Sequence, residues 1–175
     1  MDTLSLADAN LDPTIDALTD YYRTFTPAES RVLDLMSSWI SHLPAEVSYR
    51  QVAGLGMNSE ELAANERLDT YCVQNLNENP ELPYPAESFD RVMIVVSVQY
   101  LIRPIEVMRS IHRVLDRGGA LCIAMSHRLF PTKAVAAFQH LPRKEWIQLV
   151  AYYVDQAGFS DVAFEDRSPA NADPL

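Results

Sequence analysis

The feature that most constrains the fold of this chain is a regular alternation of short apolar runs with amphipathic segments. The clearest run is RVMIVVS at residues 91–97, which is almost wholly apolar and β-branched. Such a run is typical of a strand that is covered on both faces of a parallel sheet. Further strands are predicted at residues 31–35, 51–55, 70–74, 120–125 and 161–165. Strands that alternate with helices predict an α/β fold with a doubly wound, mostly parallel, three-layer sheet.

Capping residues and apolar spacing predict the helices between these strands. Asp12-Pro13 is typical of a helix start, and Asn58 followed by Glu61 has the pattern of a capping box. A short helix is expected from Ser37 or Ser38 to a point before Pro44, where a serine caps its first turn. Two longer amphipathic helices are predicted at residues 104–115 and 143–156, ended by Gly118-Gly119 and by Gly158.

The chain has 175 residues, which suits one domain. We expect an N-terminal helical segment at 1–30, the α/β domain at 31–166 and a polar tail at 167–175. The stretch DRSPANADPL at 166–175 is too polar and proline-rich to form a strand. Either the chain is truncated or its sheet lacks the last strand, and a second copy of the chain or the tail is then the expected cover for an exposed sheet edge.

Composition narrows the class of partner. The net charge is −10, from 14 basic and 24 acidic residues, which disfavours nucleic acid and anionic membrane surfaces. The N-terminal MDTLSLADAN has no secretory pattern, so a cytoplasmic protein is expected. Cys72 and Cys122 lie in predicted strands and are expected to be reduced. The histidines are scattered without metal-ligand spacing, so no metal site is predicted.

Three segments together resemble the class I S-adenosylmethionine-dependent methyltransferases of the methyltransferase type 11-like group. They are RVLDL, VAGLGMNSEEL and LPYPAESFDRVMIVVSVQYLIRPIEVMRSIHRVLDRGGALCIAM. The resemblance covers residues 31–166 and implies the strand order 3-2-1-4-5-7-6. It also implies S-adenosylmethionine as cofactor, lying across the carboxyl ends of the first two strands.

The resemblance is weakest at the cofactor turn, which contains no glycine. Met36, Ser38 and Ile40 stand where the family has glycines, Gly56 where it has an acid that binds ribose, and Asn75 where it has an Asp that binds adenine. We expect a narrowed pocket that binds S-adenosylmethionine more weakly than relatives with the glycines do. If the pocket is open and the ribose lies in the family's pose, Gly56→Asp should strengthen cofactor binding. The resemblance implies the following cofactor-binding residues: Asp34, Met36, Ser37, Ser38, Trp39, Gly54, Gly56, Asn58, Asn75, Leu76 and Ser97.

Tyr100 and His127 follow the fourth and fifth strands and are the candidate catalytic residues. His127 would act as a general base, whereas an alternative is that Tyr100 packs under the next helix. The function that the resemblance implies is methyl transfer from S-adenosylmethionine to a small-molecule acceptor. The alternative is a non-catalytic binding or scaffold protein in which Met36 and Trp39 fill the pocket. An NAD oxidoreductase is disfavoured, because GLGMNS follows the second strand and lacks the dinucleotide pattern.

Overall fold

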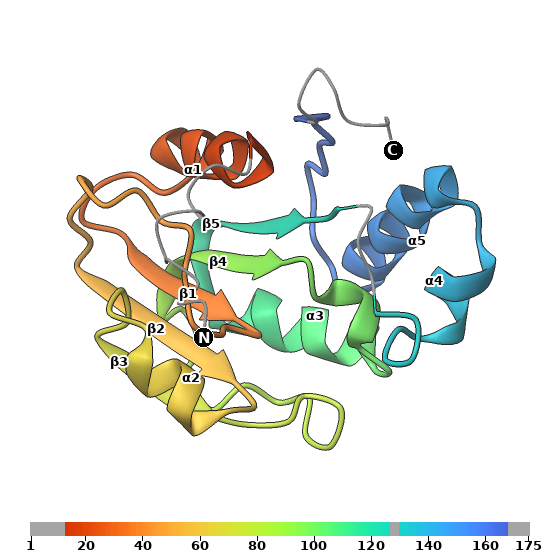
Figure 1. The fold of residues 1–175 in the computed structure, drawn as a ribbon, viewed down its shortest axis with the longest axis horizontal. Coiled ribbons are helices and arrows are strands. Elements are labelled where there is room, and N and C mark those ends of the chain that lie inside the picture. Colours follow the sequence, from red (N-terminus) through yellow and green to blue (C-terminus); the bar gives the residue numbers. More distant parts are fainter. Residues whose placement is uncertain (1–12, 127–129, 168–175) are drawn as a thin grey trace, which may run out of the picture.

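The computed structural model describes residues 13–126 and 130–167. Its centre is a five-stranded parallel sheet in the order β3-β2-β1-β4-β5 (Figure 1). The strands are β1 (Arg31–Leu35), β2 (Gln51–Gly56), β3 (Thr70–Val73), β4 (Phe89–Val95) and β5 (Leu115–Ala124). The α/β prediction is therefore confirmed, and so is the order of these five strands.

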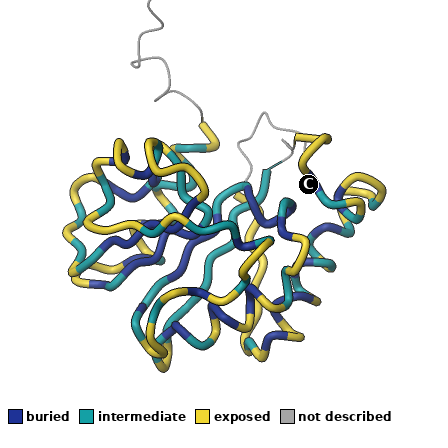
Figure 2. Tube along the Cα trace, turned by 90° about the horizontal axis from the view of Figure 1, so that it is seen from below, coloured by how far each residue is buried: buried dark blue, intermediate teal, exposed yellow. Residues whose placement is uncertain are grey.

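Helices cover both faces of the sheet and make three layers (Figure 1). The helices are α1 (Pro13–Phe25), α2 (Ser59–Ala64), η2 (Val98–Tyr100), α3 (Pro104–Val114), α4 (Ala136–His140) and α5 (Arg143–Gln156). The core against α3, α4 and α5 contains the side chains of Leu33, Leu35 and Ile94. The core against α1 contains Val32 and Met93, which alternate with the first set along their strands. Burial is accordingly concentrated in the central strands (Figure 2).

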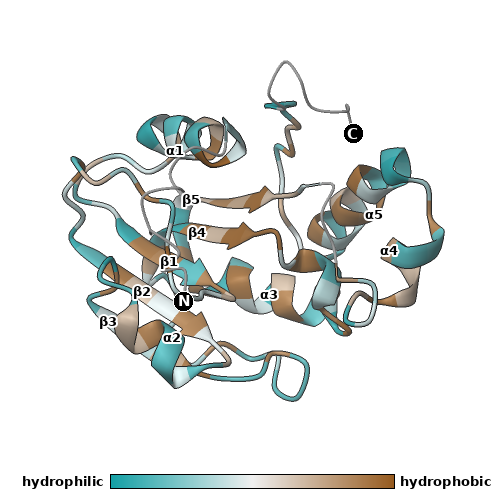
Figure 3. Cartoon of the chain, viewed as in Figure 1, coloured by the Kyte–Doolittle hydropathy of each residue, from teal (hydrophilic) through white to brown (hydrophobic). Residues whose placement is uncertain are grey.

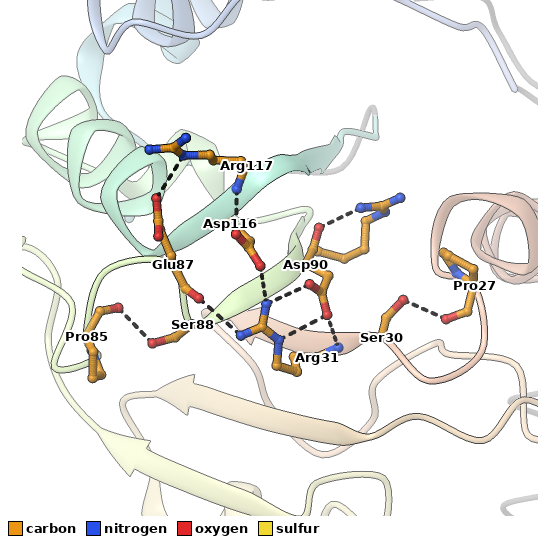
Figure 4. A network of polar contacts seen from close by, with 10 residues as sticks. Pro27, Ser30, Arg31, Pro85, Glu87, Ser88, Asp90, Asp116 and Arg117 are labelled. Atoms are coloured by element: carbon orange, nitrogen blue, oxygen red, sulfur yellow. Dashed lines mark hydrogen bonds and ion pairs between the residues drawn. The ribbon is translucent and has the colours of Figure 1, made fainter.

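An arginine joins three strands at the amino end of the sheet (Figure 4). The Arg31 guanidinium donates to both carboxylate oxygens of Asp90, at 2.7 and 3.2 Å, and to Asp116 at 2.6 Å. These contacts connect β1, β4 and β5 at the edge opposite to the carboxyl ends. The Arg31 hydrogen bonds hold the pKa of Asp90 below its usual value.

The two cysteines lie in separate parts of the sheet, as predicted. Cys72 is in β3 and Cys122 is in β5, so β2, β1 and β4 stand between them. Both are free thiols. Four inter-strand spacings of about 4.8 Å are too long for a disulfide.

Two expectations about the second half of the chain are wrong. Gly118 and Gly119 do not end a helix, because β5 already begins at Leu115 and accommodates both glycines next to an irregularity in its pairing with β4. Residues 161–165 form no strand. Helix α4 is an element that the sequence pattern did not predict. No helix within the described ranges has the length and apolar character needed to cross a bilayer.

Candidate cofactor site at the carboxyl ends of the strands

The chain leaves β1 through a strained turn at Met36. This residue has φ of 60°, a left-handed conformation that favours glycine, and its side chain packs against the core. A non-glycine residue in this conformation costs about 1–3 kcal/mol. Met36 therefore adopts the conformation for which the family uses a glycine at this position, with a partly buried side chain.

The next residue, Ser37, closes over the end of β2. Its amide donates to the Leu55 carbonyl at 2.9 Å, which extends the pairing of β1 with β2 by one step. Its own carbonyl oxygen lies 2.3 Å from the point where a Cβ on Gly56 would stand. Gly56 is required because backbone occupies the space of any side chain. The expected effect of Gly56→Asp is therefore corrected, since the new side chain would collide with the turn instead of reaching a ribose.

The buried carboxylate of Asp34 stabilises this turn through hydrogen bonds. Asp34 accepts hydrogen bonds from the hydroxyls of Ser37, at 2.7 Å, and Ser41, both on the same carboxylate oxygen. Burial raises the pKa of Asp34 to about 6, and the two serine hydroxyls oppose this shift. Asp34 is 4% exposed and its partners are serines of the loop. It therefore acts as a support of the turn.

Two residues of the α2 region fasten the loop from the side. Ser38 donates through its hydroxyl to Glu61 at 2.5 Å. The Asn65 amide donates to the Ser38 carbonyl at 2.8 Å and to the Ser41 hydroxyl at 3.1 Å. Asn65 is itself buried. We call residues 36–41 with these contacts the latched loop.

The helix expected from Ser37 or Ser38 to Pro44 is absent. Residues 37–50 contain neither helix nor strand. Serine side chains that bond to nearby groups compete with helix formation, and here two of them are committed to Asp34. Without this helix, there is also no helix amino terminus here that could attract a carboxylate.

The apolar residues at this edge point to solvent. Trp39 is 56% exposed, so it does not fill a pocket, whereas Met36 is partly buried against the core. Gly54 lies against Leu68 inside the sheet layer and is buried. Asn58 caps α2 by accepting from the Glu60 amide at 3.0 Å, as its capping pattern predicts.

Polar side chains that can form further hydrogen bonds lie just after the ends of β3 and β4. The Asn75 side-chain oxygen accepts from the Asn77 amide at 3.1 Å and can accept one bond more. Leu76 beside it is buried. The Ser97 hydroxyl is buried without a hydrogen-bond partner among the described residues. An orphaned buried hydroxyl costs about 1–3 kcal/mol, and the Tyr22 hydroxyl, Arg67 Nε and Arg113 Nε are orphaned in the same way elsewhere among the described residues.

Of the two candidate catalytic residues, Tyr100 and His127, the structure describes only Tyr100. The Tyr100 hydroxyl accepts from the Phe130 amide at 3.1 Å, and its ring packs against the core, which fits the packing alternative. His127 lies outside the described residues. No group of three or more His, Cys, Asp or Glu residues that could hold a metal ion occurs in the ranges that the structure describes.

S-adenosylmethionine fits this edge only in part. Asn75 retains an acceptor for an adenine amino group, and Ser97 offers a buried hydroxyl. At β2, however, the Ser37 carbonyl occupies the place of the acid that would hold the ribose. No acidic side chain can therefore hold a ribose from position 56 while the latched loop lies over the end of β2.

Sequence reasoning missed the residues that fasten the loop. Ser41 and Asn65 were not selected, and Glu61 was selected only as a cap. The signal for Ser41 was present in the spacing, since serines three and seven residues after Asp34 both reach it. Asn65 carried no such signal, because only the fold brings α2 beside the loop.

Comparison with known proteins agrees with the fold. A family of methyltransferase domains matches residues 37–123. A search of curated proteins gives no match. An S-adenosylmethionine-dependent methyltransferase from Mesorhizobium loti is 18% identical, with a TM-score of 0.60 and coverage of 83% of both chains.

Two further solved structures extend the comparison. The [4+2]-cyclase SpnF is 22% identical, with a TM-score of 0.65 and coverage of 87% of this chain and 61% of that one. Phosphoethanolamine N-methyltransferase 2 from Haemonchus contortus, solved with S-adenosyl-L-methionine, is 22% identical with a TM-score of 0.60. It covers 83% of this chain, which in turn spans 37% of the enzyme.

The match of a methyltransferase domain to residues 37–123 and the five-stranded parallel sheet give this chain the fold of the class I S-adenosylmethionine-dependent methyltransferases. A cyclase among structures of the same fold shows that the fold alone does not fix the reaction.

Proposed function

We propose that the chain is an S-adenosylmethionine-dependent methyltransferase that acts on a small-molecule acceptor at the carboxyl edge of the sheet. The observation that carries this proposal is the match of a methyltransferase domain to residues 37–123, and the buried Ser97 hydroxyl without a partner at the end of β4 supports it. A ligand that donates to or accepts from this hydroxyl would recover its lost hydrogen bond. The acidic net charge of −10 supports a small acceptor over a nucleic acid.

Methyl transfer requires few catalytic side chains. The cofactor supplies a methyl group on a sulfonium, which passes to a nucleophilic atom of the acceptor. The protein's part is alignment, which can contribute about 7–11 kcal/mol to the barrier. Asn75 would accept from an adenine amino group, and Ser97 would contact the ligand near the end of β4. Tyr100 remains a candidate for positioning the acceptor, and His127 for taking its proton.

The latched loop favours a second candidate, a non-catalytic protein of the same fold. The Ser37 carbonyl fills the place of the ribose-binding acid, and three residues outside the loop hold the loop there: Asp34, Glu61 and Asn65. A chain selected for binding a partner through this edge has no need of an open ribose site.

Calorimetric titration with S-adenosylmethionine and with S-adenosylhomocysteine separates the two candidates. Binding in the micromolar range, about −8 kcal/mol, supports the methyltransferase. Ser97→Ala should then weaken binding without loss of stability, since its hydroxyl has no partner to lose. Ser88→Ala, before the other end of β4, is the matched control and should bind as the wild type does.

Failure of both ligands to bind at millimolar concentration would refute the enzyme proposal and support the non-catalytic one. Tight binding that Ser97→Ala leaves unchanged would retain the enzyme but remove Ser97 from its site.

A further inference from the structure

The left-handed backbone conformations at non-glycine residues fall into two groups. Among the described residues, one group contains exposed acidic residues in turns and bends: Glu29, Glu87 and Asp161. The other contains Met36 and Val96, which are partly buried and directly follow β1 and β4. Val96 has φ of 47°, which is an outlier for a β-branched residue.

Met36 and Val96 lie at the point where the order of the strands reverses. β1 and β4 are neighbours in the sheet, and the chain continues from β1 to β2 and β3 on one side and from β4 to β5 on the other. Open α/β sheets bind their ligands outside the carboxyl ends of the strands at such a point. Strained backbone is also concentrated at binding sites. The latched loop accounts for Met36, and Val96 marks a second constrained turn, after β4.

Hydrogen bonds fix both peptide groups of Val96. Its amide donates to the Ala124 carbonyl of β5 at 2.8 Å, and its carbonyl accepts from the side-chain amide of Gln99 at 3.0 Å. Gln99 is 4% exposed, and its own backbone carbonyl accepts from the Val135 amide at 3.0 Å. A strained residue persists only where its surroundings fix it in this way. Of the two bonds to Val96, the one from Gln99 comes from a side chain and can be removed by substitution.

Ser97 follows Val96 and makes no hydrogen bond through its hydroxyl to the described residues. It is the first polar residue after the apolar residues 92–96, and β4 before it is largely hydrophobic (Figure 3). Ser97 is the cap residue of η2, yet its side chain makes no capping bond, and the Tyr100 amide donates to the Ser97 backbone carbonyl at 3.0 Å. A serine in this place usually accepts through its hydroxyl from the amide two or three residues ahead, with an extended backbone. With ψ of −11°, Ser97 is not extended.

We propose that Gln99 is a positioning residue, which holds Val96 in its left-handed conformation and thereby keeps the Ser97 hydroxyl free for a ligand at the end of β4. This inference rests on the proposed function, in which Ser97 contacts the ligand. Without the bond from Gln99, Val96 relaxes to an extended conformation, Ser97 turns with it, and its hydroxyl accepts from an amide of η2. The ligand must then break this bond before it can bind. Gln99 acts through Val96 and does not itself contact the ligand.

A double-mutant cycle in urea unfolding tests this role without a ligand. Gln99→Met retains about the same side-chain length but cannot donate a hydrogen bond. Ser97→Ala should leave the unfolding constant of the wild type nearly unchanged, because its hydroxyl has no partner to lose among the described residues. In the Gln99→Met background, Ser97→Ala should raise the unfolding constant about fivefold, since it then removes a hydrogen bond. Equal effects of Ser97→Ala in the two backgrounds overturn the proposal.

Calorimetric titration with S-adenosylhomocysteine tests the consequence for binding. Gln99→Met should weaken binding about fivefold, because the Ser97 hydroxyl is then free in only a fraction of the molecules. Val96→Gly, added to Gln99→Met, should recover most of this loss, since glycine adopts a positive φ without strain and needs no support. A glutamine that only packs in the core would give no such recovery.

Gln139→Met and Glu29→Gly are the matched controls, and both should bind as the wild type does. The Gln139 side-chain amide also donates to a backbone carbonyl, that of Ala134, and Glu29 has φ of 63° in an exposed turn before β1. If the wild type binds and Gln99→Met binds equally well, or if Val96→Gly recovers nothing, the role of Gln99 is overturned and the proposed function stands. Failure of the wild type to bind at millimolar concentration refutes the proposed function, and the role of Gln99 in binding with it.

Discussion

Alanine substitution at two glycines of β2 measures how closely the latched loop is pressed on the sheet. At Gly56 the added methyl meets the Ser37 carbonyl oxygen at 2.3 Å, and at Gly54 it meets the Leu68 Cδ1 at 2.4 Å. The first obstacle is backbone that is hydrogen-bonded to β2, whereas the second is the end of a flexible side chain. Both glycines are buried in the same strand, so their intrinsic strand preferences cancel in the comparison.

Gly56→Ala should lower the free energy of unfolding by about 2–3 kcal/mol, because overpacking against backbone costs about 1–3 kcal/mol and the Ser37–Leu55 hydrogen bond adds about 1 kcal/mol. Gly54→Ala should cost under about 1 kcal/mol, since Leu68 can change rotamer and alanine is the better strand residue. Urea unfolding followed by circular dichroism measures both. If the two variants lost equal free energy of unfolding, or Gly54→Ala lost more, the loop would not lie over Gly56. The interpretation that Ser37 fills the place of a side chain at position 56 would then be wrong.

Three further predictions concern stability. Asp34 has a folded pKa of about 6, above its unfolded value, so the folded protein binds more protons and the free energy of unfolding falls as pH rises from about 4 to 6. Urea unfolding of the wild type relative to Asp34→Asn should show a loss of about 3 kcal/mol across that pH range. A difference that does not change with pH would refute the burial of the carboxyl group. Asn65→Ala should cost about 2–3 kcal/mol by removing two buried hydrogen bonds to the loop, whereas the exposed cap Asn58→Ala should cost about 1 kcal/mol. Arg31→Met should be most destabilising near neutral pH and least at low pH, because the lowered pKa of Asp90 contributes stability that is lost as pH falls through it; urea unfolding at pH 3 and 7 decides this.

Much of the sheet could be predicted from local pattern. Strands such as residues 91–97 are buried on both faces, so a continuous apolar run is both required and visible. The cap at Asn58 is equally local, because its acceptor serves amides two and three residues away. The element that failed most clearly, residues 161–165, has strand-like composition. A strand also needs a neighbour, and its own sequence does not show whether one exists.

The turn after β1 could not be predicted for a different reason. A serine after a strand is a good helix cap, and the sequence offers two of them at Ser37 and Ser38. The fold brings Asp34 and Glu61 within reach of these hydroxyls, and long-range hydrogen bonds then replace the local cap. The positive φ of Met36 follows the family's glycine pattern, but the closure over Gly56 depends on tertiary contacts alone.

The latched loop also sets the affinity that can be expected for S-adenosylmethionine. A pose that needs the loop to open breaks the contact of Ser37 with Leu55 and those of Ser38 and Ser41 with Glu61 and Asn65. Four hydrogen bonds at about 1 kcal/mol each amount to about 4 kcal/mol, or roughly 1,000-fold in affinity. A site that binds in the nanomolar range with the loop open would then bind in the micromolar range that the calorimetric test requires, and loosening the loop should tighten binding.

Trp39 offers a direct readout of that opening. It is 56% exposed on the latched loop, whereas Trp146, the second tryptophan, belongs to α5 and is buried in the core beside Phe138 of α4. In a Trp146→Phe background, S-adenosylmethionine should shift the Trp39 emission in step with the calorimetric binding curve, because the loop must move before the ribose can enter. Ser38→Ala in the same background removes the bond to Glu61 and should tighten binding about fivefold. Binding that leaves the Trp39 emission unchanged would mean that the ligand enters without opening the loop, and its ribose would then lie away from Gly56.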